Sequence, residues 1–102
     1  MTKIYMDNAS GTPIHPKVVE TMTPFLKEGF GNPSNLHQFG RITSDAIQAA
    51  RGHVAHLIHA KPNEIIFTSS GTEANNFALK GILTAHKKKG NHIITSHIEH
   101  FS

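Results

Sequence analysis

Residues 64–73 read EIIFTSSGTE, and this stretch decides how the chain is expected to fold. Its first half is a short apolar run rich in β-branched and aromatic residues, which is typical of a buried strand. In its second half Ser70 and Glu73 have the Ser-x-x-Glu spacing of a capping box, which opens a helix. Apolar residues then recur at helical spacing until Gly90 ends the segment. The stretch therefore predicts a strand that leads directly into a helix of about 18 residues.

A second strand is expected directly after this helix, at residues 92–96. Strand, helix and strand in this order form a βαβ unit, whose crossover is almost always right-handed and whose two strands run parallel. The fold class expected for the chain is therefore α/β, with a mainly parallel sheet.

The sequence before this unit predicts two more helices joined by a loop. A short strand is expected at residues 4–6 and a helix at about residues 16–28. Pro24 lies inside that helix and lacks an N–H group, so a kink or a broken first half is expected there. Residues 29–40 contain three glycines, a proline and two asparagines, which predicts an irregular surface loop. The long helix that follows has its stop signal at Pro62.

Composition excludes several classes of protein. A chain of 102 residues with 37% hydrophobic and 17% charged residues fits one small soluble domain or a piece of a larger one. The net charge of +3 is spread along the chain, so no nucleic-acid partner is expected. There is no cysteine, which excludes disulfides and thiolate metal sites within the chain. No apolar run is long enough for a signal peptide or a membrane span, so the expected location is the cytoplasm.

Polar residues follow both strands of the expected βαβ unit, at residues 69–72 and at residues 97–100. Ligands of parallel α/β sheets bind beyond the carboxyl ends of the strands, so these two segments should meet. The helix that begins near Gly71 offers free backbone N–H groups and the positive end of its dipole. Gly71 permits close approach and the hydroxyl of Thr72 adds a donor. The sequence thus predicts a phosphate-binding cup.

Other interpretations of these polar residues are open. Residues 70–73 could simply cap a helix, and Glu73 would compete with an anion. The spacings of the P-loop and of the dinucleotide fingerprint do not occur. A histidine metal-binding module would use His53, His56 and His59, or separately His97, Glu99 and His100. The His-Glu-x-x-His spacing of zinc proteases is missing, and no metal site is expected.

Four motifs, taken in order, resemble the cysteine desulfurases, which belong to the class V aminotransferase group of fold-type I pyridoxal-phosphate enzymes. The family usually opens with Tyr-Leu-Asp-Asn-Ala-Ala-Thr-Thr-Pro and continues with a Gly-Asn-Pro-Ser-Ser loop. Similar segments here are YMDNASGTP at 5–13, GNPSNLH at 31–37 with FGR at 39–41, IIFTSSGTEANN at 65–76 and ITSHIEH at 94–100. The resemblance covers essentially the whole chain and implies a fold-type I transferase.

The resemblance implies a role for each matching position. Gly71 and Thr72 would hold the phosphate of pyridoxal 5'-phosphate. His100 would stack on the pyridine ring of the cofactor and assist proton transfer, which makes it the catalytic residue expected in this chain. Residues 7–12 and 32–34 would line or support the entrance to the active site.

The opening segment departs from the family pattern at two positions. Ser10 and Gly11 stand where the family commonly has alanine and threonine.

The activity implied by the resemblance is conversion of L-cysteine to L-alanine, with transfer of the sulfur to an enzyme cysteine, as in iron-sulfur cluster assembly. It further implies a homodimer and a sulfur acceptor or scaffold protein as partner. The resemblance also implies that the family's Schiff-base lysine, the aspartate on the pyridine nitrogen and the persulfide-forming cysteine would lie beyond residue 102. Residues 1–102 are therefore interpreted as a single N-terminal segment of a pyridoxal-phosphate-dependent transferase domain, apparently truncated and expected to be inactive alone.

Two alternatives to the desulfurase interpretation stay open at this point. The chain could belong to another class V aminotransferase or to a selenocysteine lyase, because the motifs present do not separate their substrates. It could also be a non-catalytic interaction fragment, since a sheet that is begun but not completed leaves an unpaired edge.

Overall fold

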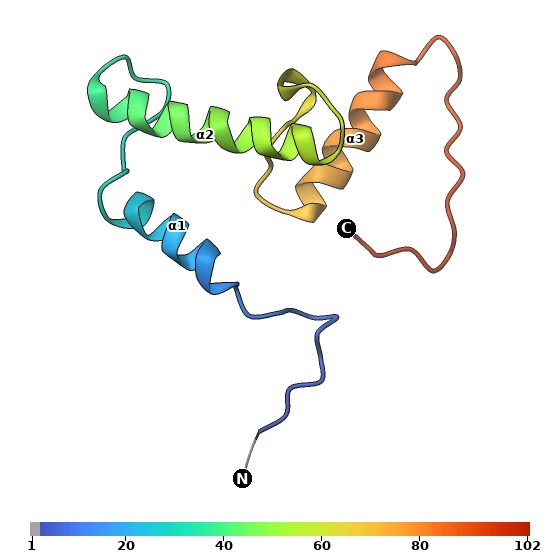
Figure 1. Ribbon diagram of the computed structural model, residues 1–102. Helices are drawn as coiled ribbons and strands as arrows, with labels where there is room; N and C mark the ends of the chain where they lie inside the picture. The colour runs from blue at the N-terminus through green and yellow to red at the C-terminus, as the bar shows by residue number, and fades with distance from the viewer. Residues whose placement is uncertain (1–2) are drawn as a thin grey trace. The chain divides into compact units, whose positions relative to one another are not determined.

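The computed structural model describes residues 3–102 and is helical (Figure 1). Within these residues the elements are α1 (Pro16–Lys27), α2 (Gln38–Leu57), the short 3-10 helix η1 (Pro62–Glu64) and α3 (Gly71–Ala85). The chain divides into two compact units, Met1–Pro62 and Asn63–Ser102. The first unit contains α1 and α2, and the second contains α3.

Helix α1 begins where a proline is best tolerated. Pro16 is the first helical residue, a position whose N–H group would have no partner in any case. The ring of His15 caps the helix, because its Nδ1 accepts a hydrogen bond from the Lys17 N–H at 3.2 Å. The helix continues across Pro24, and the Glu28 N–H donates to the Pro24 carbonyl at 2.8 Å. The predicted helix is confirmed, and Pro24 does not end it.

The loop between α1 and α2 is held by its own backbone. The side-chain oxygen of Asn32 accepts from the Ser34 N–H at 2.9 Å, which fixes a tight Asx turn. A Cβ atom on Gly31 would collide with the Phe39 carbonyl, and one on Gly40 would collide with the Asn35 carbonyl. Both positions need glycine because two backbone segments touch there.

Helix α2 ends in a Schellman motif formed without glycine. His59 follows the C-cap with a φ of 56°, and the Ala60 N–H donates to the Ala55 carbonyl at 2.9 Å. The His59 N–H donates to the His56 carbonyl at 3.3 Å, which completes the pair of capping bonds. Ala55 is also the most buried apolar residue, with 1% of its surface exposed. His59 therefore ends a helix and does not extend a row of metal ligands.

The strands expected at residues 4–6, 64–68 and 92–96 do not form within residues 3–102. The 3-10 helix η1 takes up Glu64, and the chain after α3 runs as an open trace without regular structure (Figure 1). Ile66 and Ile94, which a sheet would bury, are 61% and 99% exposed. A strand exists only through hydrogen bonds to a neighbouring strand, and its apolar face needs a covering layer. The helical part of the expected βαβ unit is confirmed, and the sheet stays a prediction.

Candidate functional site

The start of α3 follows the capping signal in the sequence. Ser70 is the N-cap residue, with an extended backbone, and its Oγ accepts a hydrogen bond from the Glu73 N–H at 3.2 Å. The carboxylate of Glu73 reaches one residue further back than a capping box requires. Its Oε2 accepts from both the N–H and the hydroxyl of Ser69, each at 2.6 Å. Residues 69–73 are thereby tied into one hydrogen-bonded turn.

This turn leaves a set of donors at the end of the helix. Within residues 3–102 the N–H groups of Gly71 and Thr72 donate to no acceptor, and the hydroxyl of Thr72 makes no hydrogen bond. The next amides along the helix are engaged, since those of Glu73 and Ala74 donate to the Ser70 Oγ and carbonyl. Two backbone amides, one hydroxyl and the positive end of the helix dipole together suit an anion with several oxygens.

Gly71 keeps the approach to these donors open. A Cβ atom placed on Gly71 would meet no described atom within 4 Å apart from its own helix backbone and chain neighbours, so this side of the helix start is open within the second unit. A ligand oxygen can therefore come close to the backbone here. The open side and the unengaged donors are compatible with the phosphate cup, which stays a prediction.

Glu73 carries a negative charge next to the cup. The Ser69 hydroxyl, and after it the Ser69 amide, hold the pKa of the exposed Glu73 carboxylate below its ordinary value. The carboxylate is thus ionised at neutral pH. Its charge is favourable at a helix N-terminus.

His100 lies beside the second turn of α3. A hollow of about 370 Å³ separates this turn from the end of the chain, and the hydrogen bond from Asn75 Nδ2 to Ser102 Oγ at 2.9 Å joins its two sides. The residues that line the hollow come from both sides: Asn75, Ala78, Leu79, Thr95, Glu99, His100 and Ser102. The structure therefore brings His100 to the second turn of α3, and the meeting of residues 97–100 with residues 69–72 stays a prediction. Gly71 and Thr72 lie one turn away and do not line this hollow.

The imidazole of His100 has one face and one nitrogen in use. Its ring stacks on Phe101 with centroids 4.4 Å apart and planes inclined by 21°. Nδ1 accepts from the Ser102 N–H at 3.1 Å, so a neutral ring carries its proton on Nε2. The second face and Nε2 are the parts that a ligand could use.

The sequence placed Ser69 among the polar residues 69–72 of the expected site but did not predict its bond to Glu73, and it gave Asn75 no role. Asn75 comes four residues after Gly71, which places both on the same face of a helix, so the helical period was a usable signal. The contact between Ser69 and Glu73 had no such signal, because a capping box would have directed the carboxylate to Ser70.

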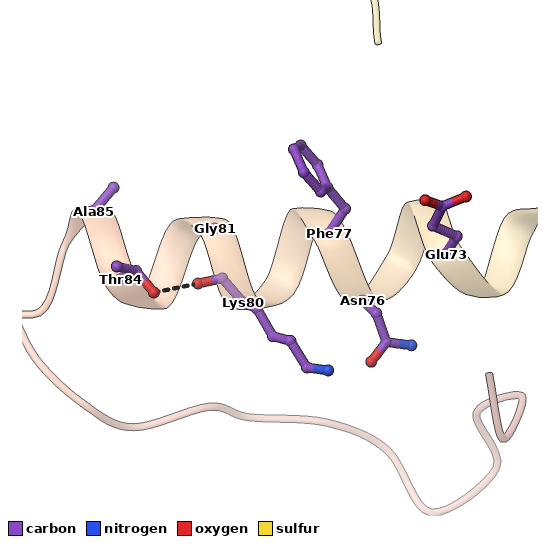
Figure 2. A pocket seen from close by; sticks show the side chains of 7 residues that line it. All are labelled: Glu73, Asn76, Phe77, Lys80, Gly81, Thr84 and Ala85. Atoms are coloured by element: carbon purple, nitrogen blue, oxygen red, sulfur yellow. Dashed lines mark hydrogen bonds between the residues drawn. The ribbon is translucent and has the colours of Figure 1, made fainter. Parts of the chain in front are cut away.

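A second, larger hollow lies along another face of α3, and Figure 2 shows its lining. Its volume is about 610 Å³, and its residues all come from this one helix: Glu73, Asn76, Phe77, Lys80, Gly81, Thr84 and Ala85. Phe77 is 56% exposed, and the hydroxyl of Thr84 is used within the helix, donating to the Lys80 carbonyl at 2.8 Å. Polar groups do not converge on it from a second element. We interpret it as an apolar helix face, and the candidate site is the start of α3.

The other residues expected near the active site lie in the first unit. The hydroxyl of Tyr5 donates to the carbonyls of Asp7 and Gly11, at 2.8 and 3.2 Å, and so closes the opening segment into a turn. In the second motif, Asn35 Nδ2 lies 3.2 Å from the Nε2 of His37. Both segments are ordered by local contacts.

Residues 3–102 contain neither a cluster of metal-binding side chains nor a membrane-spanning helix. No group of three or more histidine, aspartate or glutamate side chains comes together there in a way that could hold a metal ion. In the same part of the chain no helix is both long enough and apolar enough to cross a membrane.

Comparison with known proteins places the chain in a family. The aminotransferase class-V model matches residues 4–102. The chain belongs to the aminotransferase class-V family. The resemblance carried by the four sequence motifs is thus confirmed at the level of the family.

Named relatives of this class-V chain include the cysteine desulfurases IscS of Dictyoglomus turgidum, 56% identical over 98 residues, and of Methanosarcina thermophila, 50% identical over 97 residues. These alignments cover 96% and 95% of this chain, but 25% and 24% of the relatives. A solved NifS-like protein is similar with a TM-score of 0.88 and 36% identity, over 97% of this chain and 27% of its own. The chain spans about a quarter of the length of the relatives that it matches.

Proposed function

We propose that this chain provides the cofactor-phosphate and ring-stacking part of a pyridoxal-phosphate-dependent cysteine desulfurase. One observation carries the proposal. The backbone N–H groups of Gly71 and Thr72, at the start of a helix in a class-V chain, have no hydrogen-bond acceptor among residues 3–102. The relatives named cysteine desulfurase, at 50–56% identity, support the choice of reaction. That reaction would convert L-cysteine to L-alanine and pass the sulfur to an enzyme cysteine, as in iron-sulfur cluster assembly.

The donor set fits the phosphate of the cofactor. The N–H groups of Gly71 and Thr72 and the Thr72 hydroxyl would bind phosphate oxygens, and such charge-assisted hydrogen bonds are stronger than neutral ones. The helix dipole adds a favourable interaction with the dianion. Pyridoxal phosphate, when bound, supplies an electron sink for the carbon that loses a substituent. What this chain adds is a fixed position for the phosphate end.

His100 would perform two tasks. Its free ring face would stack on the pyridine ring and fix the plane of the cofactor. Its Nε2 would hold or move a proton, because Nδ1 is engaged by the Ser102 amide. Phe101 covers the other face of the imidazole and keeps the ring in one plane. His100 is thus the catalytic residue proposed for this segment.

The remaining parts of the proposal follow from the family. Residues 1–102 would form the N-terminal segment of the transferase domain, and residues 7–12 and 32–34 would line or support the entrance to the active site. The whole enzyme would be a cytoplasmic homodimer that passes sulfur to an acceptor or scaffold protein.

The phosphate site is tested on the full 102-residue chain with pyridoxamine 5'-phosphate, which cannot form an imine with the chain's lysines. We expect it to bind at least about tenfold more tightly than pyridoxamine, since hydrogen bonds to charged groups contribute about 1.5–3 kcal/mol each. Thr72→Val should lose about tenfold in affinity for the phosphate form alone. The matched control is Thr84→Val, which removes a hydroxyl from the same helix that bonds only to Lys80.

The binding measurement has a clear contrary result. If the unaltered chain bound pyridoxamine and pyridoxamine 5'-phosphate with equal affinity, the proposed phosphate site would be wrong. If Thr72→Val and Thr84→Val lost affinity equally, the loss would come from a general effect on the helix. The dissociation constants can be measured by equilibrium dialysis or by the fluorescence of the pyridoxamine ring, because the chain contains no tryptophan that would interfere.

The reaction is tested in a chimaera. This chain replaces the matching quarter of the Dictyoglomus turgidum relative, and the product is given L-cysteine and a thiol reductant. We expect alanine and sulfide in equal amounts. A chimaera that holds the cofactor but leaves L-cysteine unchanged would turn the proposal toward another class-V reaction, such as that of an aminotransferase or a selenocysteine lyase.

A further inference from the structure

Resting on the proposed function, we propose that Glu73 is a positioning residue for the cofactor phosphate. By accepting both hydrogen bonds of Ser69, its carboxylate fixes the turn that presents the amides of Gly71 and Thr72. The same contacts keep the carboxylate from occupying those amides itself.

The first step of the argument concerns competition. A carboxylate in the first turn of a helix is a natural partner for free amides and would exclude an anionic ligand if it bound them. Here Oε2 of Glu73 accepts from the Ser69 N–H and hydroxyl, each at 2.6 Å, and no amide of Gly71 or Thr72 donates to the carboxylate. The charge of Glu73 and a bound phosphate would therefore use separate donors.

The second step concerns the shape of the turn. Three hydrogen bonds link Glu73 to Ser69 and Ser70, and the Thr68 hydroxyl donates to the Ser70 carbonyl at 3.1 Å. All of these contacts are made between residues 68–73 of the chain itself, so the turn is held by its own side chains and backbone. Such preorganisation increases affinity because less conformational freedom is lost on binding.

The third step concerns charge. Glu73 is solvent-exposed, and the charged group that shares its helix face is Lys80, two turns along α3. If Glu73 acted only through its charge, it would repel a phosphate, and its removal would increase affinity. If it positions the turn, removal of its oxygen atoms must decrease affinity. The two roles predict changes of opposite sign.

The test compares Glu73→Gln and Glu73→Ala in the full chain, with Glu20→Gln on α1 as a control for the loss of one negative charge. We measure the dissociation constants of pyridoxamine 5'-phosphate and of pyridoxamine, and the helix content by far-ultraviolet circular dichroism. Glutamine keeps an oxygen that can accept from Ser69, so we expect Glu73→Gln to stay within about threefold of the parent. Glu73→Ala should lose about tenfold for the phosphate form only, and Glu20→Gln should not differ from the parent.

Three results would overturn the inference. Tighter phosphate binding by both Glu73 variants would make the residue a repelling charge, and unchanged affinity in both with reduced helix content would make it a helix cap. Equal losses for pyridoxamine and its phosphate would reveal a general loss of structure. If the parent chain itself does not prefer the phosphate form, the proposed function fails first, and that outcome is distinct from a parent that binds and an alanine variant that binds equally well.

Discussion

Helices α2 and α3 both begin after a loop with an N-cap side chain that accepts a backbone hydrogen bond. His37 Nδ1 accepts from the Gly40 N–H at 3.3 Å, and Ser70 Oγ accepts from the Glu73 N–H at 3.2 Å. The two starts differ in what surrounds their glycines. Gly40 is buried against the carbonyls of the preceding loop, whereas Gly71 has no neighbour on the side where a Cβ would stand. One helix start is closed by its own chain, and the other is open to a ligand.

The largest expected change in stability comes from Gly40→Ala, which disrupts the closed start of α2. The added Cβ would collide with the Asn35 carbonyl, and backbone cannot move aside as a flexible side chain can. We expect the free energy of unfolding of the first unit to fall by about 3 kcal/mol, the upper part of the range for overpacking. Urea titration followed by far-ultraviolet circular dichroism measures the change.

Gly52→Ala is the matched control for this prediction. Gly52 lies inside α2 with open space around it, so alanine should stabilise the helix by about 1 kcal/mol through its higher helix propensity. The prediction is wrong if both alanine variants are equally stable.

The helices could be predicted from the sequence because their signals are local. The capping residues predicted that α3 begins near Gly71, where it does begin. The period of apolar residues predicted α1 to about residue 28, and the helix ends one residue earlier, at Lys27. The stop of α2 at Leu57 comes earlier than Pro62 suggested, because His59 adopts a left-handed conformation that sequence patterns reserve for glycine. A conformation that the residue type does not favour leaves no signal.

The strands could not be obtained in the same way, because their stability comes from partners. The apolar run of residues 64–68 predicts a strand, yet regular pairing needs neighbouring strands on both sides and covering helices. In the candidate site, the expected topology and the family resemblance together predicted that Gly71 and Thr72 bind a phosphate. Ser69 was expected among the polar residues 69–72, but its bond to Glu73 was not predicted, because that bond depends on the side-chain conformation of a single carboxylate.

A smaller change in stability is expected when Glu73, at the open start of α3, is protonated at acidic pH. The folded-state pKa of Glu73 lies below its ordinary value of 4.5, because the Ser69 hydroxyl and amide stabilise the charged form. Its contribution to stability is therefore complete above that ordinary value and is lost as the pH falls through the folded-state pKa. The Ser69 amide signal in a ¹⁵N-resolved NMR titration should move over this acidic range. Glu73→Gln should abolish the movement, and a midpoint at or above 4.5 would contradict the assigned cause.

The smallest effect on stability is expected from Gly71→Ala, and it is the sharpest test of the comparison. The added Cβ would meet no atom within 4 Å, and alanine is a better helix former than glycine. The free energy of unfolding should therefore change by less than about 0.5 kcal/mol, against about 3 kcal/mol for Gly40→Ala. If Gly71→Ala proved as destabilising as Gly40→Ala, the start of α3 would be closed by contacts of its own and unsuited to a phosphate. If stability is kept while pyridoxamine 5'-phosphate binds more weakly, the open side of Gly71 is the side that the ligand uses, because a methyl group there obstructs only what comes from outside the chain.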